Sequence, residues 1–432
     1  MSAAAGRWKM HFPGNLAWSN AALVTKGMAP YGAVALGEID EICERLQSRQ
    51  GEPDAWREEW AAAGQRLEAQ AEAAARAGHA RTAGSAWLRA GMYFFTAERF
   101  VYPGEEKRSL GERAIRCQQA GLLGRYPGMH GVEVPFGETT LPALFMPAQG
   151  AVPGGRAPTV VVFDGMDNCK EMSVLFCGLE FAARGWNTLA IDGPGQGETL
   201  RLRGLCARHD YEVAGTAALD FLLQRDDVDP AAVVAMGYSF GGYYAARIAA
   251  FEPRYAAGVA FAALHWDLAG FQREVLQRQQ ADPKATAQST FHFAWIMGCL
   301  GDAEGAIRKA ERFTLEGVAE KIAMPFLIVH GADDKVVPVA AAQRLHDALV
   351  TPGRALKVFT AEEGASGHCC VDNRPVGVDF IADWIEDTLG RTAVAIAATA
   401  ASSTPASSTP ASSIPASSTP ASSTASNHSK GT

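Results

Sequence analysis

One stretch constrains the fold of this chain more than any other: residues 233–247, which read Val-Val-Ala-Met-Gly-Tyr-Ser-Phe-Gly-Gly-Tyr-Tyr-Ala-Ala-Arg. An apolar run leads into a Gly-x-Ser-x-Gly turn and an alanine-rich apolar run follows, so the pattern predicts a strand, a sharp turn and a helix. Such a turn strains its serine, here Ser239, and exposes the hydroxyl, while the flanking glycines avoid a clash. The backbone amide of Phe240 can then stabilise an oxyanion. The alternative is an ordinary strand–helix turn whose serine caps the helix.

Length, charge and cysteine usage narrow the class of protein. A chain of 432 residues is long enough for about two or three domains. Its net charge of −8 and the lack of a basic block argue against nucleic acid as a partner. No apolar run is long enough for a bilayer and no signal-peptide pattern is evident, so we expect a cytoplasmic protein without a membrane partner. Eight cysteines without C-x-x-C spacing indicate reduced thiols, and we expect neither a metal site nor a bound cofactor.

The first 125 residues have the composition and spacing of helices. Apolar residues recur three to four positions apart, and alanine, glutamate, glutamine and arginine are abundant. Helices are expected at about 37–50, 52–77, 81–101 and 110–123. We therefore predict a helical, cap-like N-terminal domain over residues 1–125, in which most aromatic side chains pack the core.

The pattern changes near Pro127, where strands begin to alternate with helices. The expected strands span residues 131–136, 140–146, 159–163, 188–191, 233–236, 257–263, 325–330 and 356–360. This alternation predicts an α/β domain over residues 126–392, with a mostly parallel sheet and helices on both faces. Residues 268–320 interrupt the alternation and are predicted to form a helical lid. The Ala/Ser/Thr/Pro repeats of residues 393–432 are predicted to be disordered.

A serine nucleophile needs a base, and the base needs an acid that orients it. Residues 330–338 read His-Gly-Ala-Asp-Asp-Lys-Val-Val-Pro, which matches a common acid-loop pattern at Asp334, with Asp333 as the alternative. His368 follows the last predicted strand in a glycine-flanked loop and is the candidate base, the alternative being an ordinary surface histidine. Serine, aspartate and histidine in this order, each after a predicted strand, are the arrangement of α/β-hydrolases.

Residues after two other predicted strands are candidates for the rest of the site. The turn that follows residue 163 is expected to supply a second oxyanion donor, the amide of Met166, although a simple tight turn would have the same sequence. Asp167 lies beside it, and Trp266 and Asp267 follow the strand at 257–263. These three side chains are candidate substrate contacts, and loop or packing roles explain them equally well.

Together these motifs resemble one branch of the α/β-hydrolases, which includes 2,6-dihydroxypseudooxynicotine hydrolase, fungal heptaketide-shortening hydrolases and the fermentation–respiration switch esterases. The resemblance covers most of residues 35–390 and includes the helical region before the sheet. The motifs that carry it are Asp-Gly-Pro-Gly-Gln-Gly-Glu at 192–198, Gly-Gly-Tyr-Tyr-Ala at 241–245 and Gly-His-Cys-Cys at 367–370.

The resemblance implies Ser239 as nucleophile, Asp334 as orienting acid and His368 as base. It also implies a substrate bound between the helical and sheet domains, and a homodimer. Several members of the branch cleave carbon–carbon bonds of β-diketone type and others cleave esters. The resemblance therefore favours a serine hydrolase that cleaves a C–C or ester bond in a small acylated aromatic or polyketide-type substrate. The alternatives are an acyltransferase that uses the same three residues, and a ligand-binding protein without catalysis on the same scaffold.

Overall fold

The strands predicted after residue 126 form one sheet. The structure, a computed structural model, describes residues 10–151, 154–166, 168–281 and 290–390. Its strands are β1 His130–Phe136, β2 Thr139–Met146, β3 Ala157–Phe163, β4 Asn187–Ile191, β5 Val228–Tyr238, β6 Ala257–Phe261, β7 Phe326–Gly331 and β8 Arg354–Phe359. They pair in the order β1-β2-β4-β3-β5-β6-β7-β8.

The direction of pairing determines where a site can form. The β1–β2 hairpin is antiparallel, as is the β2–β4 pair, and all other neighbours are parallel, which confirms the predicted mostly parallel sheet. Phe163 of β3 lies in register with Gly237 of β5. The loops that follow these two strands therefore start side by side at the carboxyl edge of the sheet, where open α/β sheets bind their ligands.

Side chains of the central strands alternate between two cores, because successive residues of a strand point to opposite faces. In β3, Val161 and Phe163 belong to one core and Val160 and Val162 to the other. The first face is covered by α9 (Glu212–Leu223), α10 (Phe240–Phe251) and α15 (Val339–Ala348), and the second by α7 (Leu179–Ala183) and α16 (Arg374–Thr388). The prediction of helices on both faces is confirmed.

The structure describes five helices before the sheet. They are α1 Leu16–Lys26, α2 Leu36–Gln47, α3 Ala55–Arg76, α4 Ala80–Glu98 and α5 Glu105–Arg125. The four helices predicted from periodicity are confirmed as α2 to α5, whereas α1 was not predicted. The Asn15 side chain caps α1 by accepting the Trp18 amide at 3.0 Å. Trp18 packs on Trp56 of α3, with 5.3 Å between the ring centroids. Long-range packing therefore stabilises α1, and a local pattern does not reveal it.

The helical region and the sheet share a core. Trp56 and Trp60 of α3 belong to the same buried cluster as Leu144 of β2 and Met172. The described residues up to Gly390 accordingly form one compact unit, in which the two segments predicted on either side of residue 125 pack together.

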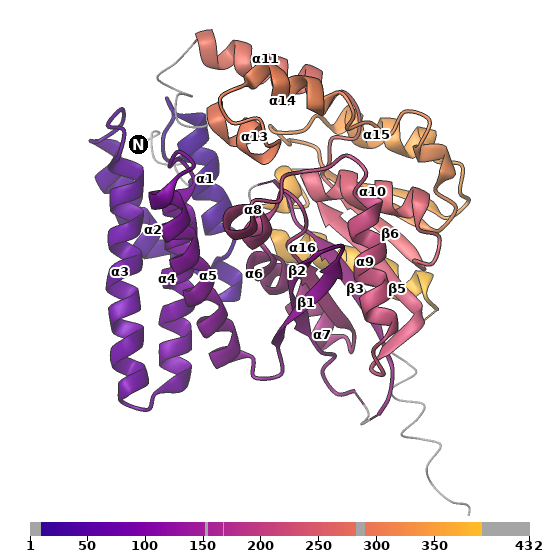
Figure 1. The fold of residues 1–432 in the computed structure, drawn as a ribbon, viewed down its shortest axis with the longest axis horizontal. Helices are drawn as coiled ribbons and strands as arrows, with labels where there is room; N and C mark the ends of the chain where they lie inside the picture. The colour runs from indigo at the N-terminus through magenta and orange to yellow at the C-terminus, as the bar shows by residue number, and fades with distance from the viewer. Residues whose placement is uncertain (1–9, 152–153, 167, 282–289, 391–432) are drawn as a thin grey trace, which may run out of the picture. The chain divides into compact units, whose positions relative to one another are not determined.

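The region predicted as a lid contains α11 (Leu268–Ala281), α13 (Thr290–Ile296) and α14 (Ala303–Ala310), drawn in orange above the sheet in Figure 1. The repeat tail at 393–432 lies outside the described residues.

The helices on either side of β4 are short. The segment that follows β3 consists of α6 (Lys170–Ser173), a π-helical turn (Val174–Gly178) and α7. Such turns accommodate an extra residue and are frequent near functional sites. The loop after β4 leads into a further helix, α8 (Gly197–Arg203). At 7 residues this helix is too short for periodicity to show, and it stops at a left-handed Gly204 with φ 69°.

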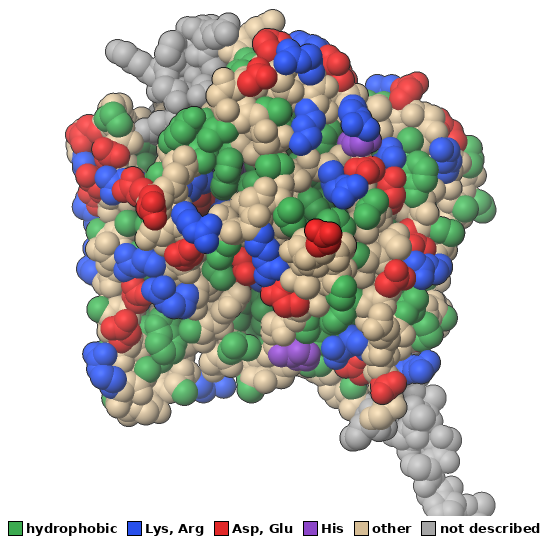
Figure 2. Space-filling model, viewed as in Figure 1, with side chains coloured by type: hydrophobic (Ala, Val, Ile, Leu, Met, Phe, Trp, Pro, Cys, Tyr) green, Lys and Arg blue, Asp and Glu red, His purple; other side chains and the backbone are tan. Residues whose placement is uncertain are grey.

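Two features of the described residues concern membranes and nucleic acids as partners: the helices and the surface charge. Within the described ranges, no helix combines the length and the apolar character that a bilayer span requires. Figure 2 shows cationic and anionic side chains interspersed over the visible face. Mixed charges of this kind are usual for a globular protein surface, whereas a nucleic-acid-binding face carries a basic patch.

Candidate active site

The turn between β5 and α10 presents Ser239 at the carboxyl edge of the sheet. Ser239 has φ 53° and ψ −125°, a strained conformation for a residue with a side chain. Backbone fills the space on both sides of it. A Cβ added to Gly237 would lie 1.9 Å from the Gly241 carbonyl oxygen, and one added to Gly241 would lie 2.1 Å from that of Phe163. The Ser239 amide donates to the carbonyl oxygen of Phe261 at 2.7 Å, which ties the turn to β6.

Three side chains from distant parts of the sequence form a hydrogen-bonded chain. His368 Nε2 lies 2.9 Å from Ser239 Oγ, and His368 Nδ1 lies 2.7 Å from Asp334 Oδ2. The alternative acid, Asp333, is exposed, and its backbone amide donates to the carbonyl of Ser366 at 3.0 Å. The structure therefore brings together the serine, histidine and aspartate that the sequence singled out, and places Asp334 rather than Asp333 on the imidazole.

Asp334 is buried and held by several donors. Its Oδ1 accepts the backbone amides of Val336 and Val337, each at 2.8 Å. His330 Nε2 lies 3.5 Å from Asp334 Oδ2 and 3.0 Å from the Val337 carbonyl oxygen. Burial raises the pKa of Asp334, but the hydrogen bond and charge of His368 and the Val337 amide lower it by more, so the pKa is below its usual value and the carboxylate stays ionised.

The same contacts act on the histidine. Burial lowers the pKa of His368, but Cys369 and the Asp334 carboxylate raise it by more, so the net pKa is above the usual 6.5. A carboxylate on Nδ1 fixes the ring orientation and stabilises the imidazolium that forms when Nε2 accepts a proton. His368 Nε2 therefore faces the Ser239 hydroxyl from a ring that Asp334 holds on its other side.

The two candidate oxyanion donors flank Ser239. Phe240 is the first residue of α10, and the amides of a helix's first turn have no acceptor within the helix. The loop that carries Met166 contacts the serine directly, because a Cβ added to Gly165 would lie 3.0 Å from Ser239 Cβ. Both amides therefore belong to backbone segments that touch the candidate nucleophile.

Two adjoining cavities lie next to the serine. The inner cavity, of about 60 Å³, is lined by Ser239, His368 and side chains from α1 and the start of α16. The outer cavity, of about 360 Å³, is lined by α1, α11, α13, α14 and the loop of Met166. Its aromatic lining residues are Phe100, Phe271 and Phe293. A ligand with a small head at the serine and a larger apolar body would fit this pair of cavities.

Several lining residues were not predicted from the sequence. Asn20, Arg99 and Val336 line both cavities, and Arg374 lines the inner one. Asn20 and Arg99 come from the helical region, which the sequence linked to the site only through a resemblance. The basic residues carry no motif, and tertiary packing alone brings them to the serine.

The structure does not bring two of the predicted substrate contacts, Trp266 and Asp267, to these cavities. Trp266 is buried in the core, with the Arg344 guanidinium 4.4 Å from its ring centroid. Asp267 accepts the backbone amide of Gly270 at 2.9 Å and so caps α11. Trp266 and Asp267 both line a separate surface hollow. Asp167 lies outside the described residues.

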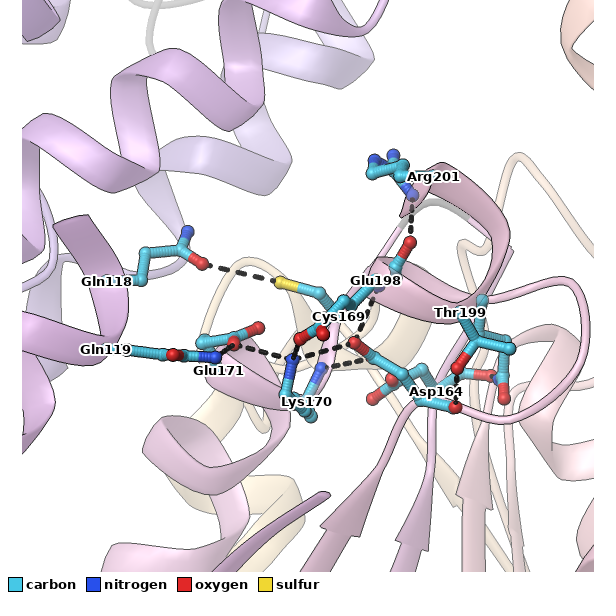
Figure 3. A network of polar contacts seen from close by, with 12 residues as sticks. Gln118, Gln119, Asp164, Cys169, Lys170, Glu171, Glu198, Thr199 and Arg201 are labelled. Carbon is cyan, nitrogen blue, oxygen red and sulfur yellow. Dashed lines mark hydrogen bonds and ion pairs between the residues drawn. The ribbon is translucent and has the colours of Figure 1, made fainter. Parts of the chain in front are cut away.

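A cluster of buried charged side chains, centred on Lys170, lies next to the loop that carries Met166 (Figure 3). The ammonium group of Lys170 contacts three carboxylates, those of Glu171 at 2.8 Å, Asp192 at 3.1 Å and Glu198 at 2.8 Å. Asp192 also accepts the backbone amides of Lys170 at 2.7 Å and Glu198 at 2.8 Å. Burial lowers the pKa of Lys170, but the three carboxylates raise it by more, so the lysine stays protonated.

Asp164 connects this cluster to the loop. Burial and the charge of Asp192 raise the pKa of Asp164 well above its usual value, which favours a protonated side chain. The Asp164 carboxyl contacts the Ser173 hydroxyl, and its backbone carbonyl accepts the side-chain amide of Gln196. The Tyr211 hydroxyl in turn donates to Gln196 Oε1. Buried polar contacts thus hold the first residue of the loop on both its side chain and its backbone.

The helical region is tied to the same cluster. Gln119 of α5 donates to Glu171 Oε1 at 3.4 Å. A second buried group lies nearby, where Glu98 of α4 contacts Lys107 of α5 and accepts Arg201 Nη2 of α8 at 2.5 Å. Burial raises the pKa of Glu98, but Arg201 and Lys107 lower it by more, to about 2. Ionic contacts therefore fix the helices against the sheet at the edge where Ser239 lies.

Comparison with known proteins places the chain among hydrolases. Residues 181–392 match the Prolyl oligopeptidase family. The chain is 28% identical over 401 residues to the hydrolase LUC6 of a Fusarium species, which covers 84% of this chain and 94% of that protein. It is 30% identical over 306 residues to the hydrolase ORFZ of Pyricularia oryzae, which covers 67% of this chain and 68% of that protein. It spans about half the length of several further fungal hydrolases.

The fold has a close counterpart among solved structures. The crystal structure of 2,6-dihydroxy-pseudo-oxynicotine hydrolase superposes with a TM-score of 0.68 and 23% identity, covering 84% of this chain and 95% of that chain. At this identity the likeness concerns the fold. The match extends over the helical region as well as the sheet, so both segments share their arrangement with a known hydrolase.

Replacing Lys170 with methionine tests the buried cluster. Without the ammonium group, the carboxylates of Asp192, Glu171 and Glu198 lose their shared counter-charge in a buried site. We expect the free energy of unfolding to fall by about 3–5 kcal/mol, measured by urea denaturation. The matched control is Arg76→Met, whose ion pair with Glu72 is exposed (72% and 56% for the two side chains). The control should change stability by less than about 0.5 kcal/mol. Equal stability of parent and K170M would mean that the carboxylates need no cation.

Proposed function

Because the chain belongs to the α/β-hydrolase family, we propose that it is a serine hydrolase in which Ser239 is the nucleophile, His368 the general base and Asp334 the acid that orients the base. The observation that carries this proposal is the hydrogen-bonded chain Asp334–His368–Ser239 at the carboxyl edge of the sheet. A surface histidine or a capping serine has no need of a buried aspartate behind the imidazole or of a strained backbone at the serine.

The geometry supports an acyl-enzyme mechanism. Ser239 Oγ attacks the substrate carbonyl carbon while His368 Nε2 takes the hydroxyl proton. The amides of Phe240 and Met166 donate to the oxygen that becomes negative. The imidazolium then gives its proton to the departing group, which leaves an acyl ester on Ser239. His368 next takes a proton from water, and the resulting hydroxide equivalent releases the acid and restores the serine.

For the substrate, we propose a C–C bond of β-diketone type or an ester bond in a small acylated aromatic or polyketide-type molecule. The apolar, aromatic lining of the outer cavity suits such a body. A carbon leaving group must depart as a stabilised carbanion, which a second carbonyl or a phenol-like ring permits. The structural relative named for its action on 2,6-dihydroxy-pseudo-oxynicotine supports this substrate type by analogy.

Reaction with a fluorophosphonate probe tests the nucleophile. We expect one covalent label per chain, located by peptide mass spectrometry on Ser239, and no label in Ser239→Ala. Ser366, a buried serine of the histidine loop, provides the matched control, and Ser366→Ala should still be labelled at Ser239. A folded protein that takes no label, or that takes it equally in Ser239→Ala, would contradict the proposal and favour a non-catalytic binding protein.

Product analysis then separates the possible reactions. Aryl esters and 1,3-diketones are each incubated with the protein in water and with added alcohols. Free acid as the only acyl product indicates hydrolysis, whereas ester formation with the alcohol at low concentration indicates an acyltransferase. Turnover of one substrate class and not the other identifies the bond that is cleaved.

The protonation of His368 predicts the pH dependence of the reaction with the probe. Only the neutral imidazole can accept the serine proton, and the pKa of His368 lies above 6.5. The rate constant for phosphonylation should therefore rise with pH to a plateau whose midpoint lies above that value, measured from about pH 5 to about pH 10. In Asp334→Asn the carboxylate that favours the imidazolium is gone, so the midpoint should move to lower pH. A midpoint that moves upward would contradict this assignment of the charges.

A further inference from the structure

The inner cavity contains a buried cation without a carboxylate partner. Arg374, at the start of α16, is 5% exposed and lines the cavity together with Ser239. Its Nη1 donates to Met28 Sδ at 2.9 Å, and its Cζ lies 5.0 Å from the centroid of the Phe176 ring. Its Nε has no hydrogen-bond partner, and no described carboxylate makes an ion pair with the guanidinium.

Such an arrangement is unfavourable in the empty protein. A thioether sulfur is a weak acceptor and an aromatic ring compensates a cation only in part. Buried charges in folded proteins are normally paired or bound to a ligand, because removing a charge from water is costly. A guanidinium that lacks a counter-charge and lines the cavity of the candidate nucleophile is therefore explained if the ligand brings the negative charge.

The other charged residues that line the two cavities also favour an anionic ligand. Apart from histidines, the charged residues among the described lining of the two cavities are all cationic: Arg99 in both cavities, Arg278 and Lys335 in the outer one, and Arg374 in the inner one. Of these, Arg278 is exposed and makes an ion pair with Glu274 at 2.9 Å, whereas Arg374 is buried. The chain as a whole has a net charge of −8. A cationic lining in an anionic protein attracts an anionic ligand and raises its local concentration.

We propose that the substrate is an anion whose short acidic head is bound by Arg374 in the inner cavity, while its apolar body occupies the outer cavity. The head is a carboxylate or the enolate of a 1,3-dicarbonyl group, both of which present negative oxygens to a guanidinium. Arg374 is thus a specificity-determining residue. The inference rests on the proposed function of Ser239 and defines its substrate class. For a 1,3-dicarbonyl substrate, the bound enolate first takes a proton at its central carbon from the His368 imidazolium, which gives the diketone that Ser239 attacks. The same cation would then stabilise the enolate of the ketone that departs when the C–C bond breaks.

A matched pair of esters tests the carboxylate form of the head. In 4-nitrophenyl hydrogen glutarate the acyl chain ends in a carboxylate, and in 4-nitrophenyl 5-methylhexanoate an isopropyl group of the same shape replaces it. We expect the parent protein to prefer the glutarate ester by about tenfold to a hundredfold in kcat/KM, the usual worth of a charge-assisted hydrogen bond. Arg374→Met should reduce this ratio to near one, and Arg374→Lys should restore part of it. Arg76→Met, an exposed change in α3, should keep the parent ratio.

A second pair tests the enolate form. Benzoylacetone can form an enolate between its two carbonyl groups, whereas its 2,2-dimethyl derivative cannot. Each is added as a competitor of phosphonylation at a pH above the pKa of the enol. If the natural head is an enolate, benzoylacetone should protect Ser239 at least about tenfold better than the dimethyl compound, and Arg374→Met should remove the difference.

The outcomes separate this inference from the proposed function. A parent protein that takes the probe on Ser239 but shows no preference in either pair overturns the anionic substrate and leaves the nucleophile intact. A ratio that is unchanged in Arg374→Met assigns the arginine a structural role and also overturns the inference. If Arg374→Met does not fold, the preferences of the parent and of Arg374→Lys still decide it. Failure of the probe to label Ser239 refutes the proposed function itself.

Discussion

The site depends on the close approach of backbone segments around one strained residue. Ser239 adopts a left-handed φ, and the glycines beside it lie so close to neighbouring carbonyl groups that no side chain would fit. This crowding places the hydroxyl against His368, one residue before α10 begins at Phe240. A relaxed turn would avoid the strain and lose the alignment. Strain of this kind persists only where the surrounding structure compensates for it, here through a sheet buried on both faces.

The site also requires that the helical region is held in a fixed position against the sheet. The helical region packs against the sheet through a shared core and through buried ionic groups centred on Lys170 and Glu98. Replacing these groups with apolar residues of the same size could preserve stability, but the present charges also specify which surfaces meet. Because Asp164 belongs to the Lys170 cluster, the interface and the loop of Met166 are positioned together. The cavities beside Ser239 therefore exist only in the assembled unit.

The sequence predicted most of the fold and the reacting side chains, because both leave local signals. Most strands and helices are long enough for their hydrophobic periodicity to be recognised in the sequence. The turn around Ser239 requires glycine at set positions. Other parts depend on tertiary contacts. Trp266 and Asp267 follow a strand that ends at the site, yet one packs in the core and the other caps a helix. Arg99 and Arg374 reach the cavities only through the packing of α4 and α16, which no local pattern encodes.

The proposed function rests on the alignment of Ser239, the proposed nucleophile, with His368 and with the amides of Phe240 and Met166. A crystal structure of the protein after reaction with a fluorophosphonate tests this most directly. We expect phosphorus on Ser239 Oγ, with one phosphonyl oxygen accepting the amides of Phe240 and Met166 and the backbone at Ser239 unmoved. Phosphorus on another residue, or a phosphonyl oxygen that faces away from both amides, would contradict it.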